Sequence, residues 1–297
     1  MDLLKLKYFN AVCTYRTVSG AAEALHISQP SVSSAIKDLE TEFGVLLFMR
    51  EHKGMMLTRE GEILFNMSKN LLLEAEKTER IMYELGKKKS VLRLGIPPMI
   101  GSVMFPEIYR SFKENLPEVS LEITEGGRFE LLKKLEDDSL DMAFLPHDMV
   151  LGTSLSHLKV KDFEIMFCTK KDSPLSKLKS VTAEDLLKTP LVLFSDGYFQ
   201  TEEIKKWFEK SNLNPNVVLK TEQLSTIITH IEKGTLSGFA FRELLEKNPE
   251  ISLIPPKPSL NISVSLFWKK NSFMSDSMKK FKKHIKNLYH LEEEKNV

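Results

Sequence analysis

The chain has 297 residues, with 42 Lys and Arg, 41 Asp and Glu, and 42% apolar residues. This composition is typical of a soluble globular protein with about two domains, because a domain commonly holds roughly 150 residues. A transmembrane helix is excluded, since no run of about 18 apolar residues occurs. The net charge of +1 neither favours nor excludes binding to nucleic acid, so that a DNA-binding function must be argued from a motif.

The two cysteines, Cys13 and Cys168, have no Cys or His near them at the spacing of metal ligands. We therefore expect no metal site, no disulfide and a reducing, cytoplasmic compartment. Lys5 and Lys7 interrupt the only early apolar run, and no small-residue cleavage site follows it. We accordingly expect no secretory signal.

The N-terminal residues show the periodicity of short helices. Leu6, Phe9, Val12 and Cys13 recur at helical spacing and predict the apolar stripe of a first helix. After a break at 15–17, Ser19 is expected to cap a second helix over 20–25.

A third helix is predicted to begin after Ser28, with Pro30 in its first turn, and to end at Gly44. Its buried face is predicted to consist of Val32, Ile36, Leu39 and Phe43. The polar side chains that point away from this face, or lie on its shoulder, are Gln29, Pro30, Ser31, Ser33, Ser34 and Lys37.

Two helices joined by a tight turn, the second with small polar residues on its outer N-terminal half, are typical of a helix-turn-helix at about 18–37. Short donors on this half can reach base edges and phosphates in a major groove, and Lys37 suits a phosphate. The alternative is a three-helix bundle with an incidental serine cluster. The six basic and six acidic side chains within residues 1–58 mildly favour that alternative.

A short hairpin, or wing, is predicted from the apolar segments 46–50 and 55–57, which flank a turn at Gly54. This predicted hairpin carries three basic or titratable side chains, Arg50, His52 and Lys53.

Several motifs follow one another in a specific order: LKYF at 6–9, SGAAEAL at 19–25, ISQPSVS at 27–33, IKDLE at 36–40, FGVLLF at 43–48, and then Arg50, Lys53, Leu57, Thr58 and Gly61. On these residues, segment 4–58 resembles the DNA-binding domain of LysR-type transcriptional regulators. The second basic residue of the wing is usually Arg in that family, and Lys53 keeps the charge without the planar fork. The resemblance implies a winged helix-turn-helix over 1–58 that contacts DNA through Ser28, Gln29, Pro30, Ser31, Ser33, Ser34, Lys37, Arg50 and Lys53.

A long helix is predicted over 62–85, without Pro or Gly and capped by Thr58. Its apolar side chains lie close to a heptad pattern, which Glu74 interrupts; they are Leu64, Met67, Leu71, Thr78, Ile81 and Leu85. The resemblance implies that this linker, 59–89, dimerises the protein, so that two DNA-binding domains bind two half-sites on the DNA. The alternative is that the stripe packs on the core of its own chain. The residues 86–90 are interpreted as a hinge.

From residue 91 onward the period changes. Strands are predicted at 91–96, 119–124, 141–145, 163–169, 191–194, 217–220, 238–241 and 262–268, with helices at 103–114, 129–137, 201–211 and 223–233. This alternation predicts an α/β domain of two lobes with a largely parallel sheet. A ligand is expected between the lobes, where the carboxyl ends of strands meet the N-termini of helices.

The motifs LGI at 94–96, FP at 105–106, LP at 116–117, VSLEITEG at 119–126, LDMAFLP at 140–146 and KDSPL at 171–175 occur in this order. They resemble the LysR-type effector domain, which is itself similar to periplasmic solute-binding proteins. The resemblance implies an effector domain over 90–297, with one lobe at 91–161 plus 268–297 and the other at 162–267. Two positions depart from the family pattern: Arg242 stands where Pro is frequent, and Met99 where a small hydroxyl residue is common. The departure at Met99 bears on effector chemistry, so the effector of a relative cannot be carried over.

We predict that the effector is a small metabolite carboxylate. The N–H groups of Gly101, Ser102 and Val103, at the start of the predicted helix 103–114, and the Ser102 hydroxyl are expected to form an anion site, with Arg128 as a clamp. The full predicted lining is Pro98, Met99, Ile100, Gly101, Ser102, Gly127, Arg128, Pro146, Ser195, Phe199 and Gln223. The alternative is that Ser102 is only a helix cap and Arg128 a solvated loop charge.

Motifs of enzymes are absent from the sequence: it has no phosphate loop, no dinucleotide fingerprint, no zinc-protease motif and no nucleophile elbow. His147 is expected in an exposed loop, Cys168 as a buried apolar side chain, and Trp207, Phe208 and Trp268 in the core. We therefore expect a regulator with no catalytic residue and no cofactor.

Two functions remain open at this point. The first is an effector-responsive transcription factor, a homodimer that assembles into a homotetramer, binds a palindromic T-N11-A operator, contacts RNA polymerase and has no membrane partner. The second is a small-molecule binding protein whose N-terminal segment serves only for assembly.

Overall fold

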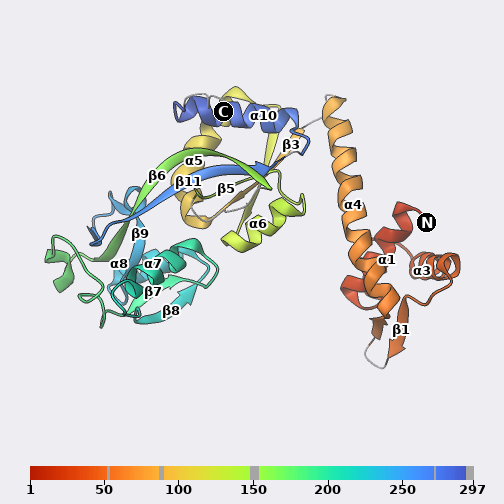
Figure 1. Cartoon of the computed structure of the whole chain (residues 1–297), viewed down its shortest axis with the longest axis horizontal. Coiled ribbons are helices and arrows are strands. Elements are labelled where there is room, and N and C mark those ends of the chain that lie inside the picture. The colour runs from red at the N-terminus through yellow and green to blue at the C-terminus, as the bar shows by residue number, and fades with distance from the viewer. Residues whose placement is uncertain (52–53, 87–89, 148–153, 271, 292–297) are drawn as a thin grey trace. The chain divides into compact units, whose positions relative to one another are not determined.

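The computed structural model describes residues 1–51, 54–86, 90–147, 154–270 and 272–291. Its chain forms two compact units, Met1–Gly86 and Lys87–Val297 (Figure 1). Lys53, most of the predicted hinge and the charged C-terminal tail lie outside the described residues.

The first unit holds four helices and one hairpin among its described residues: α1 (Leu3–Tyr15), α2 (Val18–Ala24), α3 (Gln29–Phe43), β1 (Phe48–Glu51), β2 (Gly54–Leu57) and α4 (Arg59–Leu85). Each of the first three helices begins at a side-chain cap. Asp2 accepts from the Lys5 N–H, Thr17 from the Gly20 N–H, and Ser28 from the Ser31 N–H. These caps satisfy N–H groups that have no partner within their helix.

The predictions for α3 are largely confirmed. Ser28 caps it, Gly44 ends it at φ 67°, and Val32 and Leu39 are fully buried. One detail of α3 is wrong: Phe43 lies in the last turn and is 43% exposed.

The predicted cap of α2 is also wrong. The cap is Thr17 rather than Ser19, because the Thr17 hydroxyl reaches the Gly20 N–H at 3.0 Å.

The predicted wing forms with a later start than expected. β1 and β2 pair antiparallel from Phe48 with Leu57 to Glu51 with Gly54, so that Gly54 belongs to a strand and not to the turn. The Glu40 carboxylate of α3 accepts from the Leu47 N–H at 2.8 Å, which joins the helix to the start of the hairpin. Thr58 caps α4 as predicted, since its hydroxyl accepts from the Gly61 N–H at 2.9 Å.

The second unit is an α/β domain of two lobes. Its main sheet has the order β10-β6-β11-β5-β3-β4, with β9 paired to β6, and β7 and β8 form a separate parallel pair. The strands are β3 (Ser90–Ile96), β4 (Val119–Glu125), β5 (Met142–Pro146), β6 (Leu155–Lys170), β7 (Leu191–Phe194), β8 (Val217–Thr221), β9 (Gly238–Phe241), β10 (Ile251–Ile254) and β11 (Leu260–Lys269). The helices are α5 (Pro98–Asn115), α6 (Arg128–Glu136), the 3-10 helix η2 (Pro174–Lys177), α7 (Phe199–Glu209), α8 (Leu224–Lys233), α9 (Arg242–Leu245) and α10 (Asp276–Leu288).

The prediction of a largely parallel sheet is wrong. β6 pairs antiparallel with β9, β10 and β11, and β11 pairs antiparallel with β5. β6 is also far longer than predicted, and it runs beside β11 from one lobe into the other (Figure 1). These two antiparallel strands connect the lobes, and their register shifts between Val264 and Ser265.

The first lobe has helices on both faces of its sheet. On β5, Met142 and Phe144 belong to the core beneath α5 and α10, whereas Ala143 and Leu145 join the smaller core beneath α6. This alternation follows from the two-residue period of a strand. In the second lobe, α8 packs against β6 and β7, and α7 packs against β7.

The predictions for core residues of the second unit are confirmed. Cys168 is fully buried in β6, and Trp207, Phe208 and Trp268 are at most 7% exposed. Burial raises the pKa of the Cys168 thiol, which makes it a poor nucleophile. Burial also raises the pKa of Cys13 to about 12.

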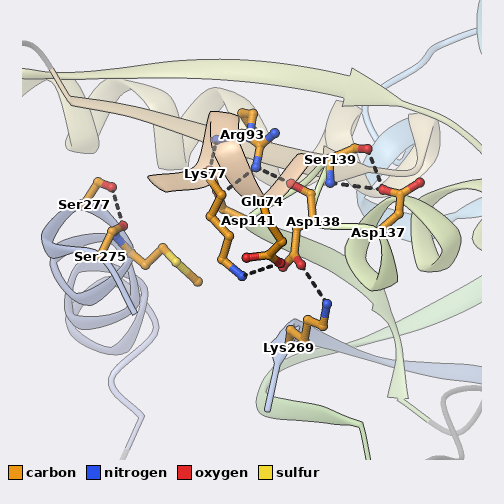
Figure 2. A network of polar contacts seen from close by, with 11 residues as sticks. Glu74, Lys77, Arg93, Asp137, Asp138, Ser139, Asp141, Lys269, Ser275 and Ser277 are labelled. Carbon is orange, nitrogen blue, oxygen red and sulfur yellow. Dashed lines mark hydrogen bonds and ion pairs between the residues drawn. The ribbon is translucent and has the colours of Figure 1, made fainter. Parts of the chain in front are cut away.

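A polar network fixes β3 to the loop before β5 (Figure 2). The Asp141 carboxylate accepts from the Arg93 N–H at 2.8 Å and pairs with the Arg93 guanidinium at 3.2 Å, and this guanidinium also donates to the Asp138 carbonyl. Lys269 of β11 pairs with Asp138 at 2.7 Å. The network explains the acid at the second position of LDMAFLP: Asp141 binds the neighbouring strand.

Candidate functional site

The outer face of α3 is exposed and polar, as predicted. Every residue proposed there to contact DNA is exposed: Ser28, Gln29, Pro30, Ser31, Ser33, Ser34 and Lys37. The Ser28 and Ser31 hydroxyls lie 2.7 Å apart, and Ser28 also caps the helix. The side chains of Ser28 and Ser31 are therefore more engaged in hydrogen bonds within the protein than those of Gln29, Ser33 and Ser34.

An open groove of about 480 Å³ runs between α1 and α3 beside this face, lined in part by Tyr8, Ser31 and Ser34. Lys5 and Asp38 form an ion pair of 2.9 Å at this groove. The hydrogen bond to Asp38 raises the pKa of Lys5, so that Lys5 is protonated and largely neutralised by its partner. Lys37 forms no ion pair with the described residues and provides the net positive charge of the face.

The wing is described in its backbone only. Arg50 lies in β1 opposite Met55, and Lys53 lies outside the described residues.

The predicted dimerisation stripe on α4 divides into two parts. Leu64 packs against the core of its own unit, so that for this residue the intrachain alternative holds. Met67 is 66% exposed and Leu71 46% exposed, and Ile63 and Met82, at 53% and 61%, extend the same side of the helix. Thr78 is exposed, Ile81 is half-buried, and Leu85 is described in its backbone only.

The predicted anion site at the start of α5 needs correction. This helix begins at Pro98, five residues earlier than expected, and the Gly101 N–H donates to the Pro97 carbonyl at 2.8 Å. The Ser102 hydroxyl donates to the Pro98 carbonyl at 2.9 Å. Gly101 and Ser102 thus lie inside the helix rather than at its free end, because Pro98 is tolerated in a first helical turn.

The other predicted lining residues differ in exposure. Pro98, Met99, Ile100, Pro146 and Phe199 are buried, Gly127 and Ser195 are half-buried, and Gln223 is exposed. The Ser195 N–H donates to the Thr221 carbonyl at 2.9 Å, and the Gln223 amide oxygen accepts from the Thr226 hydroxyl at 3.0 Å. Met99 and Ile100 belong to the hydrophobic core of the domain.

The structure joins the two lobes at Arg128. The Arg128 N–H, at the start of α6, donates to the Gly197 carbonyl at 3.2 Å. Its guanidinium lies 3.5 Å from the Glu202 carboxylate of α7 and 4.3 Å from the centroid of the Phe129 ring. Nε of Arg128 is buried without a hydrogen-bond partner among the described residues. Arg128 is therefore not a solvated loop charge: it is half-buried and faces a carboxylate across the interlobe contact.

Gly127 and Gly197 allow this contact. A Cβ atom on Gly127 would lie 3.0 Å from the Gly197 carbonyl oxygen, and Gly197 itself has φ +93°. Both positions thus favour glycine, one through close approach and the other through backbone conformation.

Sequence reasoning missed Glu202, Gly197 and Tyr198. Glu202 occurs in the first turn of a helix, where acidic residues are common, so that no local signal marks it as a partner of Arg128. Tyr198 stacks on Phe194, and burial together with Glu222, Glu130 and Glu125 raises its pKa. The interlobe contact is consequently rich in carboxylates.

His147 differs from its prediction as an exposed loop residue. It is half-buried, its Nδ1 lies 3.0 Å from the Ser265 hydroxyl, and its ring contacts that of His157. Asp148, which follows it, is not described. Within the described residues no group of three or more His, Cys, Asp or Glu side chains could hold a metal ion, and no helix is long and apolar enough to cross a membrane.

Comparisons with known proteins agree with this architecture. The model of the bacterial regulatory helix-turn-helix protein, lysR family, matches residues 3–62, and the LysR substrate binding domain matches residues 86–289. The HTH-type transcriptional regulator CzcR of Bacillus cereus is 26% identical over 296 residues, which cover 98% of this chain and 99% of the relative.

The crystal structure of CbnR, a LysR family transcriptional regulator, has a similar fold, with a TM-score of 0.72 at 18% identity and coverage of 97% of this chain and 99% of that one. HinK of Pseudomonas aeruginosa, another LysR family regulator, gives a TM-score of 0.57 at 21% identity, with coverage of 98% and 99%. The family consists of transcriptional regulators and not of enzymes. The two matched models together span nearly the whole chain, and the protein belongs to the LysR family of bacterial transcriptional regulators.

Proposed function

We propose that the outer face of α3 reads operator DNA in the major groove while the wing holds the backbone. The observation that carries this proposal is the division of the helix into two faces. Val32, Ile36 and Leu39 are buried, whereas Gln29, Ser33 and Lys37 are exposed. An assembly module, the second function considered above, would not need exposed short donors beside a lysine that forms no ion pair with the described residues.

Lys37 and Gln29 are expected to differ in how their loss affects binding. Lys37→Ala removes one phosphate contact, so it should weaken binding to all sequences and lower the salt slope by about one ion. Gln29→Ala should cost about 1–3 kcal/mol at one base position and relax the choice there. Fluorescence anisotropy on operator and scrambled duplexes over a salt series measures both effects.

Glu23→Ala serves as the matched control, because Glu23 is exposed on α2 and is not proposed to contact DNA. Arg50→Ala tests the wing in the same assay. If it leaves operator affinity intact at moderate salt, the proposed role of the wing is wrong.

We further propose that exposed apolar side chains of α4 join two chains into a homodimer, and that dimers assemble into a homotetramer. Met67 and Leu71 support this step, since a monomer would leave them in water. A two-fold dimer matches a palindromic operator of the T-N11-A type. In this proposal the protein acts in the cytoplasm and contacts RNA polymerase at the promoter.

The effector is proposed to be a small carboxylate that binds at the interlobe contact and exchanges with Glu202 on Arg128. The Arg128 guanidinium faces one carboxylate, and its Nε has no hydrogen-bond partner among the described residues. It can donate to a second carboxylate in the forked geometry that guanidinium favours. Glu125, Glu130 and Glu222 surround the same contact and disfavour a ligand with several negative charges. Gly127, Ser195, Phe199 and Gln223 would complete the site.

A calorimetric screen of small monocarboxylic and dicarboxylic acids tests this proposal. Arg128→Ala should lower the affinity of the acid that binds by about tenfold or more, whereas Glu202→Gln should raise it, because the competing internal carboxylate loses its charge. Ser102→Ala serves as the control, since its hydroxyl is engaged within α5. An acid that binds equally to all three variants would locate the effector site elsewhere.

A further inference from the structure

A second candidate ligand site lies on the first lobe, away from the interlobe contact. The C-terminal half of α5 and the helix α10 bound an open groove of about 550 Å³. Its lining includes Asn115, Leu116, Lys280, Lys283, His284 and Asn287. This volume is in the range of small-molecule sites in proteins, roughly 300–1,000 Å³.

Among the described residues the groove carries one positive charge without an ion-pair partner. Lys280 and Lys283 both line it, and no Asp or Glu is among its lining residues. Lys280 already pairs with two carboxylates, Glu118 at 2.9 Å and Asp276 at 3.0 Å, which raise its pKa and compensate its charge. Lys283 is exposed and forms no ion pair with the described residues. The Lys283 ammonium group and the amides of Asn115 and Asn287, which line the same groove, can donate hydrogen bonds to a carboxylate.

His284 adds a specific requirement. Its side chain is only 8% exposed, and its Nε2 is buried without a hydrogen-bond partner among the described residues. Burial lowers the pKa of His284, so that the ring is neutral at pH 7, and the Ile108 carbonyl accounts for a proton on the other nitrogen. Nε2 is then a hydrogen-bond acceptor. A buried acceptor without a hydrogen bond costs free energy, and a donor group on a ligand would remove this cost.

We propose that this groove binds a small hydroxycarboxylate, with carboxylate oxygens against Lys283 and a hydroxyl group that donates to Nε2 of His284. A simple carboxylate would pair with Lys283 and leave the imidazole without a donor. A neutral alcohol would donate to the imidazole and leave the Lys283 charge unmatched. The proposal does not rest on the effector site at Arg128.

L-malate and succinate are the probes, because they differ only in one hydroxyl group. Calorimetry on the full chain should show malate binding about tenfold more tightly than succinate, the gain of one satisfied hydrogen bond to a buried acceptor. His284→Phe keeps an aromatic ring against Phe112, whose centroid lies 5.7 Å from that of His284, but it removes the acceptor. This variant should bind malate and succinate equally, at the level of succinate.

His284→Gln offers an amide oxygen as acceptor and should restore part of the preference for malate, which a purely structural role of His284 would not predict. Lys283→Met should weaken both acids about tenfold and reduce their salt dependence. Lys279→Met, on the same helix but outside the groove, should change neither. If His284→Phe fails to fold, the His284→Gln and Lys283→Met variants decide the question.

Three results would overturn the proposal: no binding of malate to the wild type, an unchanged ratio of malate to succinate in the His284 variants, or loss of malate binding in Arg128→Ala. The last result would assign malate to the interlobe contact instead. Intact malate binding in Arg128→Ala, with loss of preference in His284→Phe, supports the groove whatever becomes of the effector proposal.

Discussion

Replacing Gly61 by alanine is expected to destabilise the DNA-binding unit severely. A Cβ atom at this position would lie 2.1 Å from the Leu47 carbonyl oxygen and 2.9 Å from a methyl carbon of Leu57. The first of these atoms is backbone and cannot move without shifting the start of the hairpin against α4. We expect a loss of about 3 kcal/mol in the free energy of unfolding, the upper part of the range for overpacking.

Hydrogen exchange on the full chain measures this effect, because peptides of the two units report separately. Protection of α1 to α4 should fall, while that of the second unit stays at the wild-type level and serves as an internal reference. Gly86→Ala is the matched control, since the nearest atom to its added Cβ is 3.4 Å away. Equal protection in Gly61→Ala and Gly86→Ala would contradict the tight approach of α4 to Leu47.

Leu71→Glu is expected to convert the protein into a monomer and to lower operator affinity at least a hundredfold. Leu71 is 46% exposed in the single chain, so the substitution costs little in a monomer, but it would bury a carboxylate in a helix–helix seam. In a monomer the two DNA-binding units are also no longer joined. Such joining commonly raises the affinity for DNA by a factor of about 100 or more. Sedimentation velocity measures the mass, and anisotropy measures the affinity.

Asn66→Glu introduces the same side chain on α4 at an exposed position away from the stripe. It should leave the protein dimeric and its operator affinity within about threefold of the wild type. A Leu71→Glu variant that sediments as the wild type would assign the dimer interface to another surface.

The sequence was most informative where structure is set locally. Ser28 and Gly44 delimit α3 because a cap and a left-handed residue act within one helical turn. Phe43 departs from the prediction because it continues the apolar period of α3 into a last turn that the core no longer covers. Thr17 and Ser19 are both good caps, and only the observed hydrogen bond to Gly20 distinguishes them.

Nonlocal pairing limited the prediction of the second unit. The first half of β6 pairs with β11, about 100 residues later in the chain, and no local period indicates that β6 begins at Leu155 rather than at Phe163. This long antiparallel pair turns the expected parallel sheet into a mixed one.

The candidate effector site shows the same limit. Arg128 was found from the sequence because it follows a glycine pair at the end of a strand, a position that favours ligand binding. Glu202 could not be found, because its role depends on the approach of Gly127 to Gly197 across two lobes. With proline in its first turn, α5 begins five residues earlier than predicted. The N–H groups that were expected to be free at its start therefore lie within the helix.

Selection of bound fragments from genomic DNA, carried out in parallel with the wild type and Gln29→Ala, tests most directly that α3 reads an operator. We expect the fragments bound by the wild type to share an inverted repeat with the T-N11-A spacing, and those bound by Gln29→Ala to lose preference at one base in each half-site. Fragments without a shared sequence, or the same base preferences for both proteins, would contradict a reading role for this face of α3.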